Sequence, residues 1–376
     1  MGGLDGAPVI ASGPLGEPLC WRVEHRPIDT RPREAFQIGW HRGQAINTQG
    51  AVPVRYEGPS NEVLRRRLET GLDREQLAGR SIQGLGRVPA LWPGKFYATE
   101  EITLALTDGV QLRVFAKHGP AIQPVGGYRG NHTGGLAYEG MAHATAMKIS
   151  AEGIPVLLGE ARDAAGVSLF FQLIENAVPA YRMRPEGEAM IAAGALIGAF
   201  HRRSNGEPTA LAPLNVIDRD FLLLWEEKAF ELISEVMADS VMTSGLRNAV
   251  RRTYLRDVDI LLQGSSVLVH GDYWTSNVIG AGSSMWIIDW EMAAAGPGEI
   301  DLATITIDWP EHYAMECEAA YAQARWPGAP PQAFSRTLAA ARRFTLLRIL
   351  TIAPARDRIE KYRKRVRKLA DLVAEA

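Results

Sequence analysis

The sequence predicts an α+β protein of two lobes, in which a β-rich lobe precedes a helical lobe. Between Ile102 and Ile174 the chain consists mainly of short runs with the residue alternation of β-strands. After Asn176, hydrophobic residues recur at helical spacing over long stretches. One β-like interruption, from Val267 to Asp289, holds most of the polar residues that a catalytic site needs. We therefore expect the chemistry to lie in the second lobe.

Composition places the chain among ordinary globular proteins. Hydrophobic residues make up 46% of its 376 residues and charged residues 22%, which is far from the balance of a disordered chain. The formal net charge of −2 lacks the strong positive field of a typical nucleic-acid binder, so no nucleic-acid partner is expected. Two cysteines, Cys20 and Cys317, supply neither a disulfide framework nor a cysteine-rich zinc site.

The expected location is the cytoplasm, without membrane association. The first residues show no basic region ahead of an apolar run, so they do not resemble a secretory signal. The longest apolar stretch, Met190 to Phe200, is well short of the roughly 20 residues that a membrane-spanning helix requires. Composition leaves the oligomeric state open.

Three regions are expected along the chain. Residues 1–78 form an N-terminal extension or cap, rich in Gly, Pro and Arg near its start, with an amphipathic helix from Asn61 to Leu77. Residues 79–175 form the β-rich lobe, and residues 176–376 form the helical lobe. The role of the first region is not predicted.

The β-rich lobe is expected to contain a hairpin and one helix. The runs Ile102–Leu106 and Gln111–Lys117 flank Thr107-Asp-Gly109, which is a strong turn signal between alternating segments. The other elements expected here are a helix at 137–151 and strands at 154–158 and 167–174.

Five long helices are expected in the helical lobe. The last of them has a basic face between Lys361 and Lys368. The expected ranges are 186–203, 218–242, 246–263, 332–354 and 356–376.

A second predicted hairpin brings two possible metal ligands together. Val267–His270 and Met285–Asp289 have the pattern of buried strands, and Gly280–Ser284 has that of a turn. A hairpin centred on residue 282 pairs position 277 with about position 287, so Asn277 and Asp289 come close together. Both side chains offer oxygen atoms, which Mg²⁺ prefers, while nucleotide phosphates can fill its other positions.

Asp272 has the position of a catalytic base. It lies five residues before Asn277, on the loop that leaves the buried strand. In phosphoryl transfer a carboxylate accepts the proton of the substrate hydroxyl, while a metal ion and a lysine hold the phosphates. The sequence contains each of these parts.

Three motifs carry a resemblance to a known family. They are His270-Gly-Asp272 with Asn277, then Ile288-Asp289-Trp-Glu291, and then the segment Gly296 to Ala303 that contains Asp301-Leu-Ala. In this order and spacing the sequence resembles the aminoglycoside phosphotransferase and choline kinase family. Upstream features also fit, and the resemblance extends from about residue 80 to residue 308. The upstream features are Lys117 at a strand end, Tyr138-Glu139 at a helix start, Gly153-Ile-Pro-Val, and Phe171-Gln-Leu-Ile-Glu175.

The resemblance implies a bilobal protein-kinase-like fold with an extra N-terminal segment. It also implies transfer of the γ-phosphate of ATP, or of another nucleoside triphosphate, to a hydroxyl of a small molecule with the help of Mg²⁺. An aminoglycoside-like antibiotic, an amino sugar, an amino alcohol such as choline, or a biosynthetic intermediate all fit as acceptor. In this reading Asp272 orients and deprotonates the hydroxyl, and Asn277 and Asp289 hold Mg²⁺.

The resemblance also implies a nucleotide site. Lys117 contacts the phosphates and is fixed by an ion pair with Glu139, while backbone groups of Ile174 and Asn176 bind the adenine edge. His270 and Asp301 support the catalytic loop. The phosphate-covering loop has no Gly-x-Gly-x-x-Gly match; the candidate is Trp92-Pro-Gly94-Lys95-Phe96, and the Gly-rich stretch 126–135 is an alternative.

Acceptor contacts are the least determined part of the prediction. Asp308, Trp309, Glu311, His312 and Tyr313 either line a substrate pocket or simply begin a helix after the proline at position 310. Basic residues between 340 and 348 favour an anionic substrate or serve only surface solvation.

Three other functions compete with a small-molecule kinase. A two-metal phosphoesterase is suggested by Gly130-Asn-His132 with Gly271-Asp272, but the sequence lacks the further paired His and Asp ligands that such a site needs. A protein kinase is disfavoured because the interval from Asp289 to Asp301 leaves no room for a long activation segment. A catalytically silent pseudokinase, serving as a nucleotide-binding or scaffold module, remains the alternative.

Overall fold

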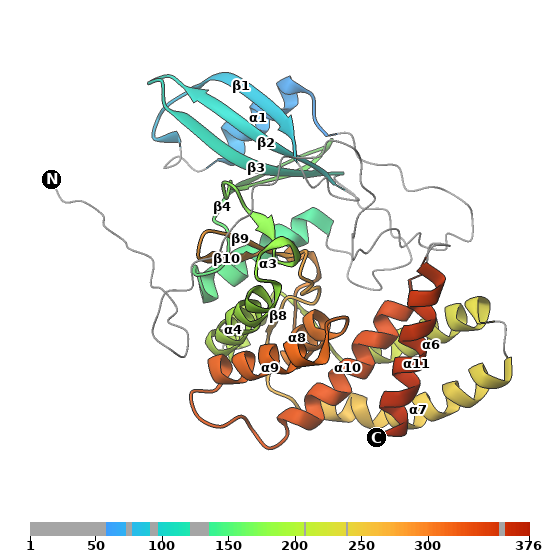
Figure 1. The fold of residues 1–376 in the computed structure, drawn as a ribbon. Coiled ribbons are helices and arrows are strands. Elements are labelled where there is room, and N and C mark those ends of the chain that lie inside the picture. Colours follow the sequence, from blue (N-terminus) through green and yellow to red (C-terminus); the bar gives the residue numbers. More distant parts are fainter. Residues whose placement is uncertain are drawn as a thin grey trace.

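The computed structural model describes residues 58–72, 77–90, 97–120, 135–206, 208–237, 240–352 and 358–376. Within these ranges an antiparallel sheet forms one lobe and a group of helices forms the other, as Figure 1 shows. The predicted α+β class and the bilobal kinase-like arrangement are confirmed. The predicted domain boundaries at residues 78 and 175 stay predictions.

The first lobe is built on a five-stranded antiparallel sheet. The predicted hairpin is confirmed, with Ile102 opposite Val114 and a tight turn in which the Gly109 N–H donates to the Leu106 carbonyl at 2.9 Å. In spatial order the strands are β1 (Ile82–Pro89), β2 (Ala98–Leu106), β3 (Gln111–Gly119), β5 (Gly166–Gln172) and β4 (Leu157–Asp163).

The strand predicted at 154–158 begins later than expected. Strand β4 starts at Leu157, and Pro155 lies outside it. Proline has no backbone N–H for a sheet ladder, and the Pro155 carbonyl instead accepts a hydrogen bond from His143 Nε2 at 2.6 Å. The apolar run therefore enters the sheet only in its last two residues.

Two helices pack on the sheet. Helix α1 (Asn61–Gly71) buries Leu64 and Leu68 in one cluster with Ile102 of β2, so it belongs to the core of this lobe. The predicted helix 61–77 is thus observed as far as Gly71. Helix α3 (Gly135–Ile149) corresponds to the predicted helix at 137–151 and contacts β3, β4 and β5.

Helices dominate the second lobe, and most of them lie close to their predicted ranges. One boundary was wrong: a single helix was expected through Met242, but α6 ends at Val236, where the Met237 N–H donates to the Ile233 carbonyl, and α7 already begins at Ser240. The helices are α4 (Glu186–Ser204), α5 (Pro208–Leu211), α6 (Arg219–Val236), α7 (Ser240–Leu262), α8 (Glu299–Thr306), α9 (Glu311–Arg325), α10 (Phe334–Leu350) and α11 (Ile359–Ala374).

The helical lobe contains more β structure than the single interruption predicted. Two small three-stranded sheets are present, with the orders β10-β9-β6 and β7-β11-β8. Their strands are β6 (Val178–Pro179), β7 (Asn215–Val216), β8 (Ser266–Val269), β9 (Val278–Ala281), β10 (Ser284–Ile287) and β11 (Ala294–Pro297). Two residues are too few for a periodic pattern, so β6 and β7 have no sequence signal of their own.

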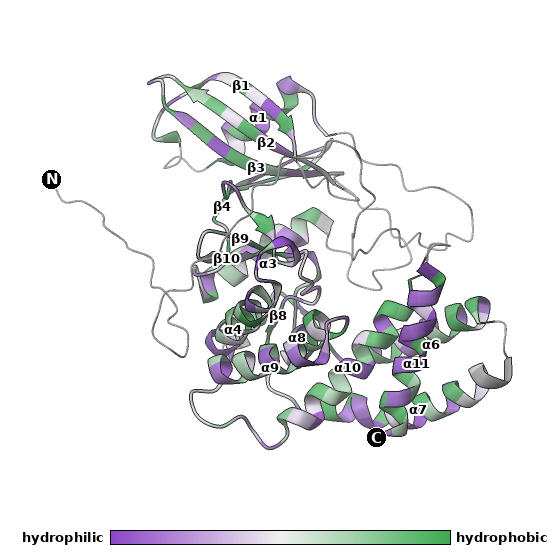
Figure 2. Ribbon diagram, viewed as in Figure 1, coloured by the Kyte–Doolittle hydropathy of each residue, from purple (hydrophilic) through white to green (hydrophobic). Residues whose placement is uncertain are grey.

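Helices α4 and α9 of the second lobe pack closely against each other. A Cβ atom added to Gly194 or Gly198 of α4 would lie 2.6 Å or 2.5 Å from backbone oxygens of α9, so only glycine permits this approach. Figure 2 shows hydrophobic and hydrophilic residues interspersed along these helices, which fits one buried and one exposed face. Among the described residues, no helix combines the length and apolarity needed to cross a membrane.

Candidate active site

The loop from His270 to Asn277 connects β8 to β9. Strand β8 is fixed by burial, since Val267 and Val269 are fully buried. The chain then turns sharply at Gly271, which has a φ of +74°. A Cβ atom here would lie 2.2 Å from the Met292 carbonyl oxygen, so both the backbone conformation and the space require glycine. This explains why glycine follows the histidine.

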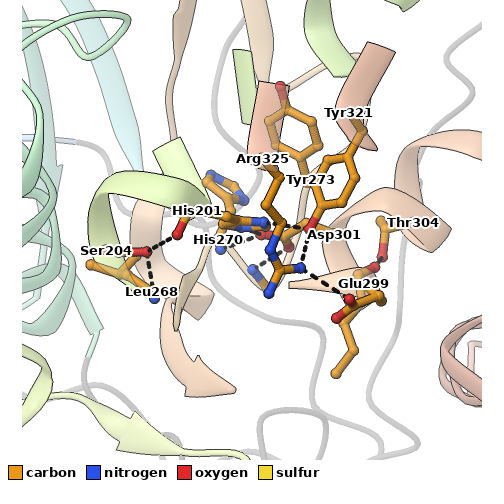
Figure 3. A network of polar contacts seen from close by, with 12 residues as sticks. His201, Ser204, Leu268, His270, Tyr273, Glu299, Asp301, Thr304, Tyr321 and Arg325 are labelled. Atoms are coloured by element: carbon orange, nitrogen blue, oxygen red, sulfur yellow. Dashed lines mark hydrogen bonds and ion pairs between the residues drawn. The ribbon is translucent and has the colours of Figure 1, made fainter. Parts of the chain in front are cut away.

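Asp301 of α8 holds the start of this loop. Its carboxylate accepts the backbone N–H of His270 at 2.6 Å and that of Gly271 at 2.9 Å, and the side chain is fully buried. Figure 3 shows the carboxylate among its partners. Hydrogen bonds to an ionised acceptor are stronger than neutral ones, so Asp301 fixes the direction in which the loop leaves β8.

A chain of buried side chains reaches Asp301 from α9 through α4 (Figure 3). His201 of α4 lies 3.1 Å from Asp301 through Nε2 and 3.0 Å from the Tyr321 hydroxyl through Nδ1. Arg325 donates to the same hydroxyl at 2.5 Å and to Glu299 at 3.0 Å. An ionised Asp301 only accepts, which gives the order Arg325 to Tyr321 to His201 to Asp301. Burial lowers the pKa of His201 despite its bond to Asp301, so the ring is neutral as this order requires.

His270 is enclosed and bonded at both nitrogens. Its Nδ1 accepts the Asp272 N–H at 3.2 Å, and its Nε2 donates to the Ile288 carbonyl at 2.8 Å. The ring therefore links the loop to the segment before Asp289. Because both ring nitrogens are already hydrogen-bonded, His270 is placed to support the loop.

Asp272 presents a partly exposed carboxylate, with a side-chain exposure of 20%. Its Oδ1 accepts Arg348 Nη2 at 2.8 Å and Trp274 Nε1 at 3.0 Å. Its Oδ2 accepts Asn277 Nδ2 at 3.1 Å. Arg348 also donates to the Gly271 carbonyl. The carboxylate is thus held in one orientation by three N–H donors from three side chains.

The hairpin of β9 and β10 brings Asn277 beside the segment that ends in Asp289. Ile287 pairs with Val278, and the Ile288 N–H donates to the Asn277 carbonyl at 2.9 Å. The register differs by one residue from the predicted pairing of 277 with 287, because the hairpin is centred between residues 282 and 283. Asp289 adopts a left-handed backbone conformation with φ 71°, and such residues concentrate at functional sites.

Lys117 joins the two lobes at this point. From β3 it donates to both carboxylate oxygens of Glu139 on α3, at 2.8 and 2.6 Å, and to Asp289 Oδ1 at 2.5 Å. The lysine side chain is 10% exposed and that of Glu139 3%. Residues separated by 172 positions in the sequence therefore meet in one buried ion cluster.

Glu291 adds a third carboxylate to this cluster. Carboxylate oxygens of Glu139, Asp289 and Glu291 lie within 4.8 Å of one another. Burial lowers the pKa of Lys117, but the carboxylates of Asp289, Glu139 and Glu291 outweigh it and raise the pKa above its usual value. Burial raises the pKa of Glu139 to about 8, with Asp289 and Glu291 adding to the shift and Lys117 opposing it. One lysine facing three carboxylates leaves an excess of negative charge that suits a hard cation.

The predicted nucleotide contacts fall partly within the described residues. Ile174 and Asn176 lie in the connection from β5 to β6, between the two lobes, and Asn176 has a φ of 57°. Gly94 and Lys95, the candidates for the phosphate-covering loop, lie outside the described residues, as does most of the alternative stretch 126–135.

The predicted acceptor residues divide into two groups. Asp308 faces α11, where it pairs with Lys361 at 3.1 Å and with Arg365. Burial raises the pKa of Asp308, but these two cations hold it below its usual value. Tyr313 has ring contacts with Trp309 at 6.3 Å and with His312 at 4.0 Å, and Glu311 is exposed at the start of α9. None of these five has a hydrogen bond or ion pair to the loop 270–277 among the contacts of the described chain.

Two residues near the loop had no predicted role, and a third, Arg348, was predicted only as one of the basic residues between 340 and 348 that favour an anionic substrate or serve surface solvation. Arg348 reaches Asp272 from α10, and the sequence offered only a basic helix as a signal. Glu291 lies in one of the predicted motifs, but no role was predicted for its carboxylate. His201 follows the apolar stretch of α4, and its full burial could not be read from its polar neighbours.

Comparisons with known proteins identify the family of the chain. The model of a family described as "Phosphotransferase enzyme family" matches residues 112–336, which is more than half of the chain. A search of curated proteins finds no match.

Solved structures share the fold at low sequence identity. A choline/ethanolamine kinase family protein from Mesorhizobium loti has 18% identity and a TM-score of 0.51, covering 83% of this chain and 94% of its own. The streptomycin–ATP–APH(2'')-IIa ternary complex has 11% identity and a TM-score of 0.52, covering 85% and 99%. A choline kinase from Cryptosporidium parvum has 12% identity and a TM-score of 0.52, covering 84% and 96%. At these identities the likeness establishes the fold.

Proposed function

The chain belongs to the phosphotransferase enzyme family, and on this basis we propose that it transfers the γ-phosphate of ATP to a hydroxyl of a small molecule, with Mg²⁺. The observation that carries the proposal is the meeting of Lys117 with Glu139 and Asp289 next to the loop of Asp272. Phosphoryl transfer depends on the positioning of the reactants and on charge neutralisation. This cluster joins the two lobes and carries the charges that both requirements need.

The donor set fits a magnesium ion. Asn277 and Asp289 are the proposed ligands, and both offer oxygen atoms at adjoining positions of the β9–β10 hairpin. The Asn277 amide nitrogen already donates to Asp272, which leaves its Oδ1 as the metal-facing atom. The negative excess of the Lys117 cluster favours a divalent cation here. When bound, Mg²⁺ neutralises charge on the phosphates.

Lys117 is the proposed phosphate contact. The neighbouring carboxyl groups of Asp289, Glu139 and Glu291 raise the pKa of Lys117, so its Nζ stays protonated, and its hydrogen bonds to Glu139 fix its direction. Backbone groups of Ile174 and Asn176 are the proposed contacts of the adenine edge, since they lie where the two lobes connect. Residues 94 and 95 are proposed to cover the phosphates.

Asp272 is the proposed catalytic base. Three N–H donors hold its carboxylate, and Oδ2 receives only one of them, so Oδ2 is the atom with room for the acceptor hydroxyl. The proton of the hydroxyl passes to Oδ2 as the hydroxyl oxygen attacks the γ-phosphorus, and the bond from this phosphorus to the β,γ-bridging oxygen breaks, so that ADP leaves. His270 and Asp301 act as supports of the loop and make no contact with substrate in this proposal.

The test is calorimetric titration of Mg-ATP into the full chain, followed by a screen of hydroxylated metabolites and antibiotics for stimulated ADP release. We expect Mg-dependent nucleotide binding and at least one acceptor that raises ADP release above hydrolysis by water. Absence of Mg-ATP binding would instead support a scaffold function. Binding without transfer to any hydroxyl would support a silent nucleotide-binding module.

A further inference from the structure

Arg348 occupies an unusual place beside the proposed base. Its side chain is 6% exposed, and its guanidinium bonds Asp272 Oδ1 at 2.8 Å as well as the Gly271 carbonyl. Helix α10 therefore carries a buried cation to the position where the acceptor hydroxyl is expected. A guanidinium group is a cation that offers N–H donors and no acceptor.

This contact determines the net charge around Asp272, where the acceptor is expected to bind. A lone carboxylate at a base position attracts a cationic acceptor, but the Asp272–Arg348 pair has a net charge of zero. Of the two other acids assigned to the acceptor from sequence, Asp308 is matched by Lys361 and Arg365, and Glu311 is exposed at the start of α9. Asp272 and Asp308 thus each already have a cationic partner, and neither of these two carboxylates is left to bind an ammonium group.

We propose that Arg348 is a specificity-determining residue that makes the acceptor site select hydroxyls on uncharged or anionic molecules over those on cations. The inference rests on the proposed transfer to a hydroxyl and deepens it by naming the acceptor class. Arg348 also fixes which oxygen acts, because its bond to Oδ1, shared with Trp274, leaves Oδ2 facing the acceptor. An ammonium group near Oδ2 would meet the guanidinium as a like charge.

The experiment compares small hydroxylated acceptors of similar size and different charge. Mg-ATP is first titrated by calorimetry into the wild-type full chain and the Arg348→Gln, Arg348→Lys and Arg342→Gln variants. ADP release is then measured near pH 7 with a library of hydroxylated compounds grouped as neutral, anionic and cationic analogues, for example glycerol, glycerate and serinol. Arg342 lies on the same helix and pairs with Glu318, so Arg342→Gln is the matched control. Melting temperatures identify variants that fail to fold.

The expected result is a change of ranking. Wild type and Arg342→Gln favour neutral or anionic acceptors, as judged by kcat/KM. In Arg348→Gln the ratio of cationic to neutral kcat/KM rises roughly 30-fold, the order expected for one unit charge about 8 Å away at an effective dielectric of about 20. Arg348→Lys keeps the charge and restores the wild-type ranking even if kcat falls, which a merely structural role would not produce.

Other results would overturn the proposal. A wild type that prefers cationic acceptors or an unchanged ranking in Arg348→Gln contradicts it. Mg-ATP binding by the wild type with no transfer to any charge class would instead contradict the proposed function. If Arg348→Gln does not fold, the proposal is still tested by the acceptor rankings of the wild type and of Arg348→Lys, because a preference for cationic acceptors in either protein contradicts it. Loss of Mg-ATP binding in the wild type would refute the proposed function itself, and is thus distinguished from failure of the acceptor class.

Discussion

Replacement of Asp301 by Asn tests the support of the catalytic loop. The side chain keeps its shape, but one oxygen that accepts a backbone N–H becomes an NH₂ group that can only donate. Since Asp301 accepts from His270 at 2.6 Å and from Gly271 at 2.9 Å in a fully buried site, at least one N–H loses its acceptor. An unsatisfied buried N–H costs about 1–3 kcal/mol, a substantial part of a total stability of about 5–15 kcal/mol.

The activity of Asp301→Asn should fall further than its stability. We expect a lower melting temperature by a few degrees and, at a temperature where the variant is folded, a kcat lower by ~10²-fold, as for a displacement of about 1 Å at a reacting group. Scanning calorimetry and ADP release measure the two effects. Thr304→Val on the same helix is the control, since it removes only the bond to the Ile300 carbonyl. An Asp301→Asn variant with the melting temperature and kcat of Thr304→Val would refute the reasoning.

Three further predictions concern the turn, the ion cluster and the metal. Gly271→Ala should destabilise far more than Gly282→Ala in urea unfolding: both residues have positive φ, but only at Gly271 does a Cβ meet a backbone atom, at 2.2 Å, so equal losses would contradict the packing argument. In metal-free protein, the raised pKa of Glu139, about 8 against the ordinary 4.5, means that the folded state retains a proton that the unfolded state has lost. Stability should therefore fall as pH rises from about 4.5 to about 8, and Glu139→Gln should flatten this slope in urea midpoints; an identical slope would exclude Glu139 as its source. Asp289→Ala should lose the Mg²⁺ dependence of ATP binding in calorimetry, whereas Mg²⁺-dependent binding at wild-type affinity would remove Asp289 from the ligand set.

The parts of the fold that follow local rules were predictable from the sequence. The hairpin around Gly109 was found because alternation and turn chemistry act over a few residues. The break between α6 and α7 was misplaced because Gly245, a helix-weakening residue, lies inside α7, while the actual ends have no strong signal. The two-residue strands β6 and β7 exist only because neighbouring segments pair with them.

In the candidate site, too, residues close together in the sequence were predictable and distant ones were not. Asp272, Asn277 and Asp289 lie within one short segment, so a single hairpin was enough to bring them together in prediction. Arg348 lies 76 positions from Asp272 and reaches it only through the packing of α10. No periodicity distinguishes it from the other arginines of that helix, for example Arg343, which pairs with Asp257. Its place depends on tertiary structure.

The most direct test of the account compares the Asp272→Ala variant with the wild type in two assays on the same preparation. Calorimetry measures Mg-ATP binding, and ADP release in the presence of the acceptor found by screening measures transfer. Removal of the base should abolish turnover and leave the affinity for Mg-ATP within a few-fold, because Asp272 contacts neither the lysine cluster nor Asp289 directly in its hydrogen bonds. Near-normal turnover by Asp272→Ala would contradict the central claim that this carboxylate accepts the hydroxyl proton.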